Sequence, residues 1–152
     1  MCIRDREGLT LSPETILTPH PAEAARLLHC STDEVRNNPL IAAQNIGLKY
    51  QATVLLKGSE SVVSRCGGAC TIVHEGDATL SAGGTGDVLA GLVAAYLAQG
   101  LSSSDAAMLG AFVHGRAGKG LGLHSAQRGV TAREIASNIP KVVSQLALVW
   151  KA

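Results

Sequence analysis

A glycine-rich turn, Gly83 to Asp87, runs directly into an apolar stretch and constrains the fold of this chain more than any other segment. Its three glycines let the backbone turn tightly, and a helix that follows would direct its free N–H groups and positive dipole end at the same point. Such a turn can hold a phosphate group. The alternative is an ordinary helix-starting loop, in which glycine supplies conformation, Thr85 caps the helix and Asp87 complements the dipole.

Asp87 favours the phosphate site over the ordinary loop. A carboxylate beside an anion site repels the phosphate unless it has chemical work to do, such as accepting the proton of a hydroxyl nucleophile. We therefore expect Asp87 to be a general base. Aspartate is also common in the first turn of helices for dipole reasons alone, so this residue does not decide the matter by itself.

Composition narrows the classes of protein. The 152 residues suit one domain, and with 46% hydrophobic but only 3% aromatic residues the core must be built from Ala, Val, Leu and Ile, as in a helix-covered sheet. The formal net charge is +1 and no basic cluster is interleaved with aromatic residues, so nucleic acid is not an expected partner. The longest apolar segment, residues 88–98, is too short to cross a bilayer, and we expect a cytoplasmic protein without membrane association.

The hydrophobic pattern divides the chain into a first part that contains the strands and a helical second part. Capping-box patterns at 31–34 and 131–134 indicate helix starts. Strands are expected at 15–18 and 52–57, with a hairpin at 61–65 and 71–74, and helices at 22–29, 39–49, 86–99, 102–119 and from 131 onward, with a break or kink at Pro140. The 86–99 helix is apolar nearly all round and should be buried.

The strands that precede the helical part are too few for a doubly wound sheet, which has about five or six. We therefore interpret residues 11–152 as the C-terminal portion of a single domain. Residues 1–10 show neither hydrophobic period nor packing logic, and we interpret them as a non-native or disordered leader.

Two further groups of residues follow predicted strands. His20 lies between two prolines that fix the backbone on both sides, and Lys57 with Gly58 ends the second strand. Ligands of open α/β sheets bind beyond the carboxyl ends of the strands, where both groups would fall. A lysine there could neutralise nucleotide phosphates, and residues 58–61 could line a nucleotide pocket. The alternatives are a structural histidine and a solvated lysine at the end of a strand.

No metal site formed by protein side chains is expected. Cys66 and Cys70 bracket two glycines between the predicted hairpin strands, and a zinc site would need two further ligands at matched spacing. The other histidines show no metal-ligand spacing among themselves and receive no role: His29, His74, His114 and His124.

Three segments together resemble one enzyme family. They are LTPHPAEAARLL from Leu17 to Leu28, VLLKG from Val54 to Gly58 and GGTGDVLAG from Gly83 to Gly91. In this combination, order and spacing the chain is similar to the ADP/ATP-dependent NAD(P)H-hydrate dehydratases. The likeness continues through 106–115 and 128–135, and it covers almost everything after about Leu11.

The resemblance implies a ribokinase-like α/β fold, a layered sheet with flanking helices, truncated here at its N-terminal side. It also implies repair of hydrated NADH and NADPH, in which ATP or ADP phosphorylates the hydroxyl of the hydrate and phosphate is then lost. His20 and Asp87 would contact the hydrated dinucleotide, Asp87 as the base, and Mg²⁺ would bridge the nucleotide phosphates. A homo-oligomer is the expected assembly. With the phosphate-holding turn included, the residues expected to bind the adenine nucleotide are Lys57, Gly58, Ser59, Glu60, Ser61, Gly83, Gly84, Thr85 and Gly86.

The sequence departs from the family pattern at two places. Ala22 stands where the family usually has Gly, and Asp77-Ala78 stands where it usually has Asn-Pro or Asn-Ala, which adds a negative charge near the expected phosphate site. The main alternative is a ribokinase-like kinase of a small alcohol, such as a thiazole or pyrimidine precursor. Its strand-end motif typically reads TPN, whereas residues 18–20 read TPH here. A non-catalytic nucleotide-binding fragment is the other alternative.

Overall fold

The computed structural model describes residues 11–149 except 13, 77 and 123–129, and within these residues no helix is both long and apolar enough to span a membrane. A short 3-10 helix, η2, precedes the glycine-rich turn. In chain order the elements are β1 Ile16–Leu17, α1 Pro21–Leu28, α2 Thr32–Asn37, α3 Pro39–Tyr50, β2 Thr53–Leu56, β3 Ser61–Arg65, β4 Cys70–Val73, η2 Ala78–Ser81, α4 Thr85–Ala98, α5 Ser103–Gly122 and α6 Ala132–Val149.

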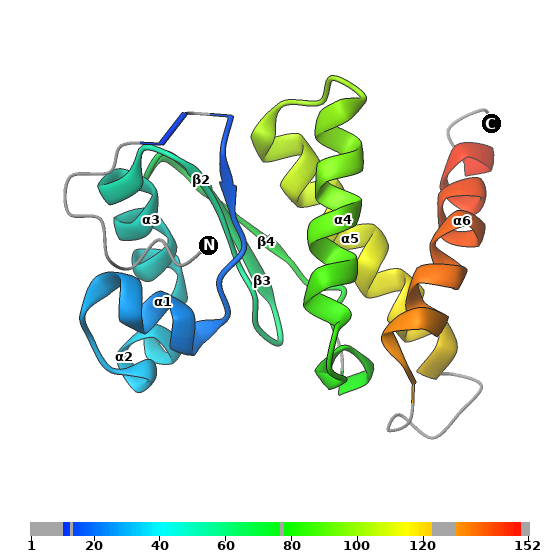
Figure 1. Cartoon of the computed structure of the whole chain (residues 1–152), viewed down its shortest axis with the longest axis horizontal. Coiled ribbons are helices and arrows are strands. Elements are labelled where there is room, and N and C mark those ends of the chain that lie inside the picture. Colours follow the sequence, from blue (N-terminus) through cyan, green and yellow to red (C-terminus); the bar gives the residue numbers. More distant parts are fainter. Residues whose placement is uncertain (1–10, 13, 77, 123–129, 150–152) are drawn as a thin grey trace.

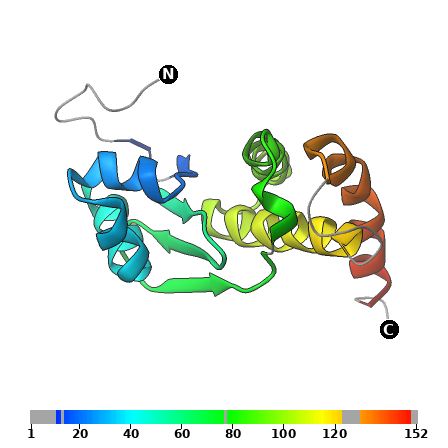
Figure 2. The ribbon, with the colours of Figure 1, turned by 90° about the horizontal axis from the view of Figure 1, so that it is seen from below.

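The strands form one four-stranded sheet in the order β1-β2-β3-β4. β1 pairs with β2 in parallel, and the two remaining pairings are antiparallel. Helices α1 to α3 lie on one side of the sheet, and α5 crosses the other side (Figure 1). Helices α4 and α6 pack on α5, so that the C-terminal helices extend away from the sheet (Figure 2).

Two hydrophobic cores lie on opposite faces of the sheet because successive strand side chains point to opposite faces. Leu55 and Val63 contribute to the core formed with α4, α5 and α6. Val54, Leu56 and Val62 contribute to the core formed with α1, α2 and α3. All four residues of β2 are buried, so this predicted strand is covered on both faces.

Helix starts agree closely with the sequence signals. Pro21 is the first residue of α1, and the capping boxes predicted at 31–34 and 131–134 are both formed. Of the break or kink expected at Pro140, the break does not occur, because α6 continues through this residue as one helix. The hydroxyl of Ser144 donates to the carbonyl of Pro140 one turn earlier.

The prediction that the 86–99 helix is buried nearly all round is also wrong. In α4 the buried side chains are Thr85, Leu89, Val93 and Tyr96, and they face α5 and α6. The opposite face is exposed and consists largely of small residues: Ala90, Gly91, Ala94, Ala95 and Ala98. Alanine and glycine have little apolar area to bury, so their exposure costs little and apolar composition alone did not identify the exposed side.

Glycines of α5 allow the segment before the glycine-rich turn to lie directly on this helix. A Cβ atom added at Gly115 would lie 2.6 Å from the backbone oxygen of Glu75, and one at Gly118 would lie 2.7 Å from side-chain atoms of Thr79 and Leu80. Both distances are shorter than a van der Waals contact. The loop after β4 and the helix η2 are therefore held against α5 at the place where the chain turns into α4.

Candidate active site

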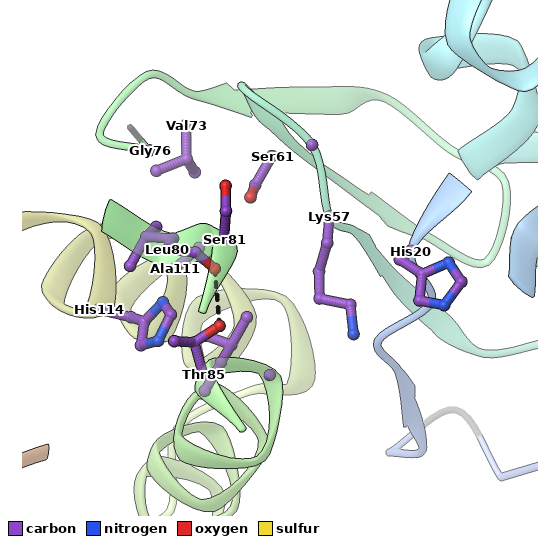
Figure 3. A pocket seen from close by; sticks show the side chains of 13 residues that line it. His20, Lys57, Ser61, Val73, Gly76, Leu80, Ser81, Thr85, Ala111 and His114 are labelled. Atoms are coloured by element: carbon purple, nitrogen blue, oxygen red, sulfur yellow. Dashed lines mark hydrogen bonds between the residues drawn. The ribbon is translucent and has the colours of Figure 1, made fainter. Parts of the chain in front are cut away.

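A pocket of about 400 Å³ lies where the sheet, η2, α4 and α5 meet. In Figure 3, Lys57 stands between His20 on one side and Thr85 with His114 on the other. The lining residues are His20, Lys57, Gly58, Ser61, Val73, Gly76, Leu80, Ser81, Thr85, Gly86, Leu89, Ala111 and His114. The structure therefore brings together six residues predicted from sequence, from three separate segments: His20, Lys57, Gly58, Ser61, Thr85 and Gly86.

The parallel pairing of β1 and β2 explains why His20 and Lys57 meet. Ile16 is opposite Thr53 and Leu17 is opposite Val54, so the two strands end at the same edge of the sheet. Beyond the strands, the backbone N–H of Lys57 donates to the carbonyl of Pro19 over 2.9 Å. The expectation that both residues lie beyond the carboxyl ends of strands is confirmed.

His20 is the N-cap of α1 and uses its imidazole as the capping group. Its Nδ1 accepts hydrogen bonds from the backbone N–H of Ala22, at 3.1 Å, and of Glu23, at 3.2 Å. The carboxylate of Glu23 accepts the backbone N–H of His20 at 2.7 Å, which completes a capping box. The direction of the His20 side chain is therefore fixed by the start of the helix.

The glycine-rich turn leaves the N-terminus of α4 without a side-chain cap. Gly84 is the N-cap residue, with a φ of 86°, and no side chain of the described residues caps this helix. Thr85 does not cap it either: its hydroxyl contacts the carbonyl oxygens of Leu80, at 2.7 Å, and Ala82, at 2.9 Å. The backbone N–H groups of Thr85 and Asp87 donate to the carbonyls of Ala82, at 3.4 Å, and Gly84, at 3.1 Å. Among the described residues this leaves the N–H of Gly86, together with the positive end of the helix dipole, to face a ligand.

Lys57 places a positive charge at this helix terminus. A Cβ atom added at Gly86 would lie 3.3 Å from the Nζ of Lys57, so the lysine occupies the space that a side chain at position 86 would need. The Lys57 side chain is 27% exposed, which leaves the ammonium accessible from the pocket. An ammonium beside the positive end of a helix is an arrangement that can hold a phosphate.

His114, which received no role from the sequence, is a buried polar residue of the pocket, as is Thr85. His114 is 4% exposed, and its Nε2 is buried without a hydrogen-bond partner among the described residues. Burial lowers the pKa of His114, the nearby charge of Lys57 lowers it further, and a hydrogen bond with the backbone of Thr85 acts in the opposite direction. The imidazole is accordingly neutral at pH 7.

Five residues predicted from sequence do not line the pocket: Ser59, Glu60, Gly83, Gly84 and Asp87. Glu60 contacts His74 instead, with 2.7 Å between Oε1 and Nδ1, which ties the β2–β3 loop to the end of β4. Asp87 is exposed in the first turn of α4. Asp77, the departure from the family pattern, lies outside the described residues, as does the segment 1–10.

Sequence reasoning missed the apolar wall of the pocket and its neighbours: Val73, Gly76, Leu80, Ser81, Leu89, Ala111 and His114. The reason for glycine at position 76 is visible only in the structure: a Cβ added there would lie 2.8 Å from the backbone oxygen of Ser59. Gly84 shows a similar constraint: its added Cβ would lie 3.3 Å from the Cβ of Ala132 at the start of α6. The start of α6 thus packs beside the glycine-rich turn.

Comparison with known proteins shows the same family at the levels of sequence and structure. The sequence profile of the NAD(P)H-hydrate dehydratases matches residues 4–141. The bifunctional NAD(P)H-hydrate repair enzyme Nnr of Escherichia coli (strain K12) is 39% identical over 129 residues, which are 85% of this chain and 25% of that protein. The ADP-dependent (S)-NAD(P)H-hydrate dehydratase of Neisseria meningitidis is 43% identical over 102 residues, 67% of this chain and 34% of that protein.

A crystal structure of the ADP/ATP-dependent NAD(P)H-hydrate dehydratase from Bacillus subtilis, co-crystallised with ATP/Mg²⁺, superimposes with a TM-score of 0.78 at 27% identity, over 86% of this chain and 47% of that one. The likeness confirms the expected ribokinase-like α/β fold. The chain spans about half the length of this solved relative and a quarter to a third of the two sequence relatives. On the match of its sequence profile and of these relatives, the chain belongs to the NAD(P)H-hydrate dehydratase family.

Proposed function

We propose that this chain carries the nucleotide-dependent half of a repair reaction on hydrated NADH and NADPH. One observation supports it most directly: the ammonium of Lys57 lies at the uncapped start of α4, in the same pocket that His20 lines. The phosphates of ATP or ADP would lie between Lys57 and the N-terminus of α4. His20 would contact the hydrated dinucleotide from the neighbouring strand end.

Asp87 would accept the proton of the hydroxyl group on the hydrated ring. The oxygen then bonds to the terminal phosphorus of the nucleotide, and the nucleotide leaves shortened by one phosphoryl group. In the second step the carbon–oxygen bond breaks, inorganic phosphate leaves, and a proton is lost from the neighbouring ring carbon, which restores the dihydropyridine. The exposure of Asp87 fits a base that meets its substrate at the open side of the helix terminus.

The nucleotide would bring its magnesium with it. Among the described residues no three or more His, Cys, Asp or Glu side chains are grouped so that they could hold a metal ion. Mg²⁺ commonly takes its ligands from phosphate oxygens and water, with few from protein, so this pocket fits an ion bound through the nucleotide. Bound in this way, the ion would neutralise phosphate charge. We also propose a homo-oligomer in the cytoplasm, testable by light scattering and cell fractionation.

The test incubates the chain with hydrated NADH, Mg²⁺ and either ATP or ADP, and follows the return of the absorbance of reduced nicotinamide. We expect absorbance to return, and Asp87→Asn to abolish the return while nucleotide binding persists. Asp105→Asn is the matched control, since Asp105 is also a first-turn aspartate, but of α5 and outside the lining of this pocket.

The outcome also separates the alternatives. A small-alcohol kinase would consume nucleotide with a hydroxymethyl-pyrimidine or thiazole alcohol and leave hydrated NADH unchanged. An inactive fragment would bind nucleotide without turnover of either substrate. Equal rates for Asp87→Asn and the unmodified chain would refute the assigned base. The family match and the relatives favour the dehydratase over the kinase.

A further inference from the structure

Glu23 links the two strand ends that form this site. Its Oε2 accepts the backbone N–H of His20 at 2.7 Å, and the same oxygen lies 3.9 Å from the Nζ of Lys57. Its Oε1 lies 3.5 Å from the Nε2 of His20. We propose that Glu23 is a positioning residue, through which His20 and Lys57 are aligned for their two ligands; the roles of these ligands rest on the function proposed above.

The bonds at α1 determine which atom His20 can offer to a ligand. Because Nδ1 accepts two backbone N–H groups, it carries no proton, and the proton of the neutral imidazole is on Nε2. The nearby Oε1 of Glu23 favours this tautomer, since a carboxylate attracts an N–H group. His20 therefore offers a hydrogen-bond donor, and a ligand atom that it contacts is an acceptor, such as a hydroxyl, amide or phosphate oxygen.

The same carboxylate also attracts the ammonium of Lys57. In the ligand-free protein it balances part of the ammonium charge and draws Nζ toward α1. When a phosphate binds to Lys57, it competes with Glu23 for the ammonium. Binding at Lys57 thus weakens the attraction of the ammonium for the carboxylate and changes how the carboxylate orients the His20 ring, so the two ends of the site are coupled through one side chain.

The chain contains its own control for the purely structural role of Glu23. Ser31 and Glu34 form the same kind of capping box at α2, where the carboxylate of Glu34 accepts the backbone N–H of Ser31 at 2.8 Å. Glutamine at the third helical position also completes a capping box. Glu23→Gln and Glu34→Gln therefore each keep a cap and remove one charge, but only the first removes a charge beside His20 and Lys57.

The first experiment needs no ligand. Ring ¹⁵N signals of His20 are recorded by NMR in the unmodified chain, Lys57→Met, Glu23→Gln, the double variant and Glu34→Gln. We expect His20 to have an unprotonated Nδ1 and a protonated Nε2. The Nε2 signal should shift when Lys57→Met is introduced into the unmodified chain. It should not shift when Lys57→Met is introduced into the Glu23→Gln variant. The Glu34→Gln spectrum should match the unmodified one. An equal Lys57→Met shift in both backgrounds, or a protonated Nδ1, overturns the proposal.

The second experiment compares binding with turnover. Because Glu23 competes with phosphate for Lys57, we expect Glu23→Gln to bind ADP or ATP up to about fivefold more tightly, the range of a surface ion pair. Because His20 loses its alignment, we expect kcat for hydrated NADH to fall roughly tenfold or more. Loss of the fold would lower both the nucleotide affinity and kcat. Glu34→Gln should change neither quantity.

Failure of the proposed function leaves a different pattern from failure of this proposal. If the protein turns over a different substrate, or binds nucleotide without turnover, the NMR comparison still decides whether Glu23 connects His20 and Lys57. If hydrated NADH is repaired but Glu23→Gln behaves like Glu34→Gln in every measurement, the function stands and the positioning role of Glu23 is refuted.

Discussion

The backbone N–H of Lys57 donates a hydrogen bond to the carbonyl of Pro19 over 2.9 Å. This bond extends the parallel pairing of β1 and β2 beyond their last paired residues and joins the segment before α1 to the segment after β2. His20 follows Pro19 in the chain, and 36 residues lie between His20 and Lys57. Backbone bonding thus brings these two residues to one pocket. Side-chain substitutions at this edge should therefore change binding without disturbing the sheet.

Replacing His20 should separate its capping role from its contact with a ligand. Asparagine is a good N-cap residue, so His20→Asn should keep α1 and leave the free energy of unfolding nearly unchanged, whereas His20→Ala should lower it by about 1 kcal/mol. Both variants lack the Nε2–H group, and both should raise the KM for hydrated NADH. Urea unfolding and steady-state kinetics provide the two measurements; equal KM values in the unmodified chain and His20→Asn would contradict the expectation.

Replacing Gly86 by alanine should displace Lys57 from the start of α4. The new Cβ would lie 3.3 Å from Nζ, and the flexible lysine would move rather than the backbone. A shift of a few tenths of an ångström weakens a charged hydrogen bond, worth about 1.5–3 kcal/mol, without removing it, so nucleotide affinity should fall by about twofold to tenfold, measured by calorimetric titration. Gly91→Ala is the control, because nothing lies within 4 Å of its added Cβ; it should bind nucleotide normally.

Gly115→Ala should destabilise the protein, because its added Cβ would lie 2.6 Å from the backbone oxygen of Glu75 and neither helix nor loop can yield cheaply. We expect a loss of about 1–3 kcal/mol in the free energy of unfolding. Gly120→Ala, in the same helix, meets only Asn138 Nδ2 at 3.5 Å and should be neutral or stabilising by up to about 1 kcal/mol. Chemical denaturation of the pair tests the close approach of the loop to α5.

Stability should depend on pH through His114. Burial lowers the pKa of His114 below its ordinary value of 6.5, so above pH 6.5 the imidazole is neutral in both the folded and the unfolded chain. As the pH falls below 6.5, the unfolded chain takes up the proton first, and the folded state loses stability until the pH passes the lowered pKa. His114→Gln should remove this contribution. Unfolding at pH 7.5 and 5.5 should show a smaller difference in the variant than in the unmodified chain; equal differences would contradict the expectation.

Local sequence signals predicted the parts of this molecule that depend on neighbouring residues. The Ser31–Glu34 and Thr131–Glu134 boxes place a carboxylate three residues after a hydroxyl, and both helices begin there. The hairpin at 61–73 follows from two β-rich segments around Gly67, which has a φ of 77°. The pocket residues His20 and Lys57 were found because prolines and a strand end are also local features.

The remaining features depend on contacts between distant segments. His114 has no neighbours in sequence that indicate a site, and its burial arises only when α5 packs beside α4 and η2. Glu23 reads as an ordinary helix-capping residue until the parallel pairing of β1 and β2 brings Lys57 next to it. The exposed side of α4 was not predicted because alanine and glycine have little apolar area, so their exposure costs little free energy.

The packing of Ala132 beside Gly84 connects the C-terminal helix to the turn that would hold phosphate. Helix α6 packs on α5 and α4 and not into the sheet, so it can open locally while the strands remain paired. Amide hydrogens of α6 should then exchange with solvent faster than those of β2. The first amides of α4 should exchange at a rate similar to that of α6. A phosphate bound at the turn would slow the exchange of the amides of α6 and of the first amides of α4. Amide exchange in the C-terminal helix would then report ligand binding at the glycine-rich turn.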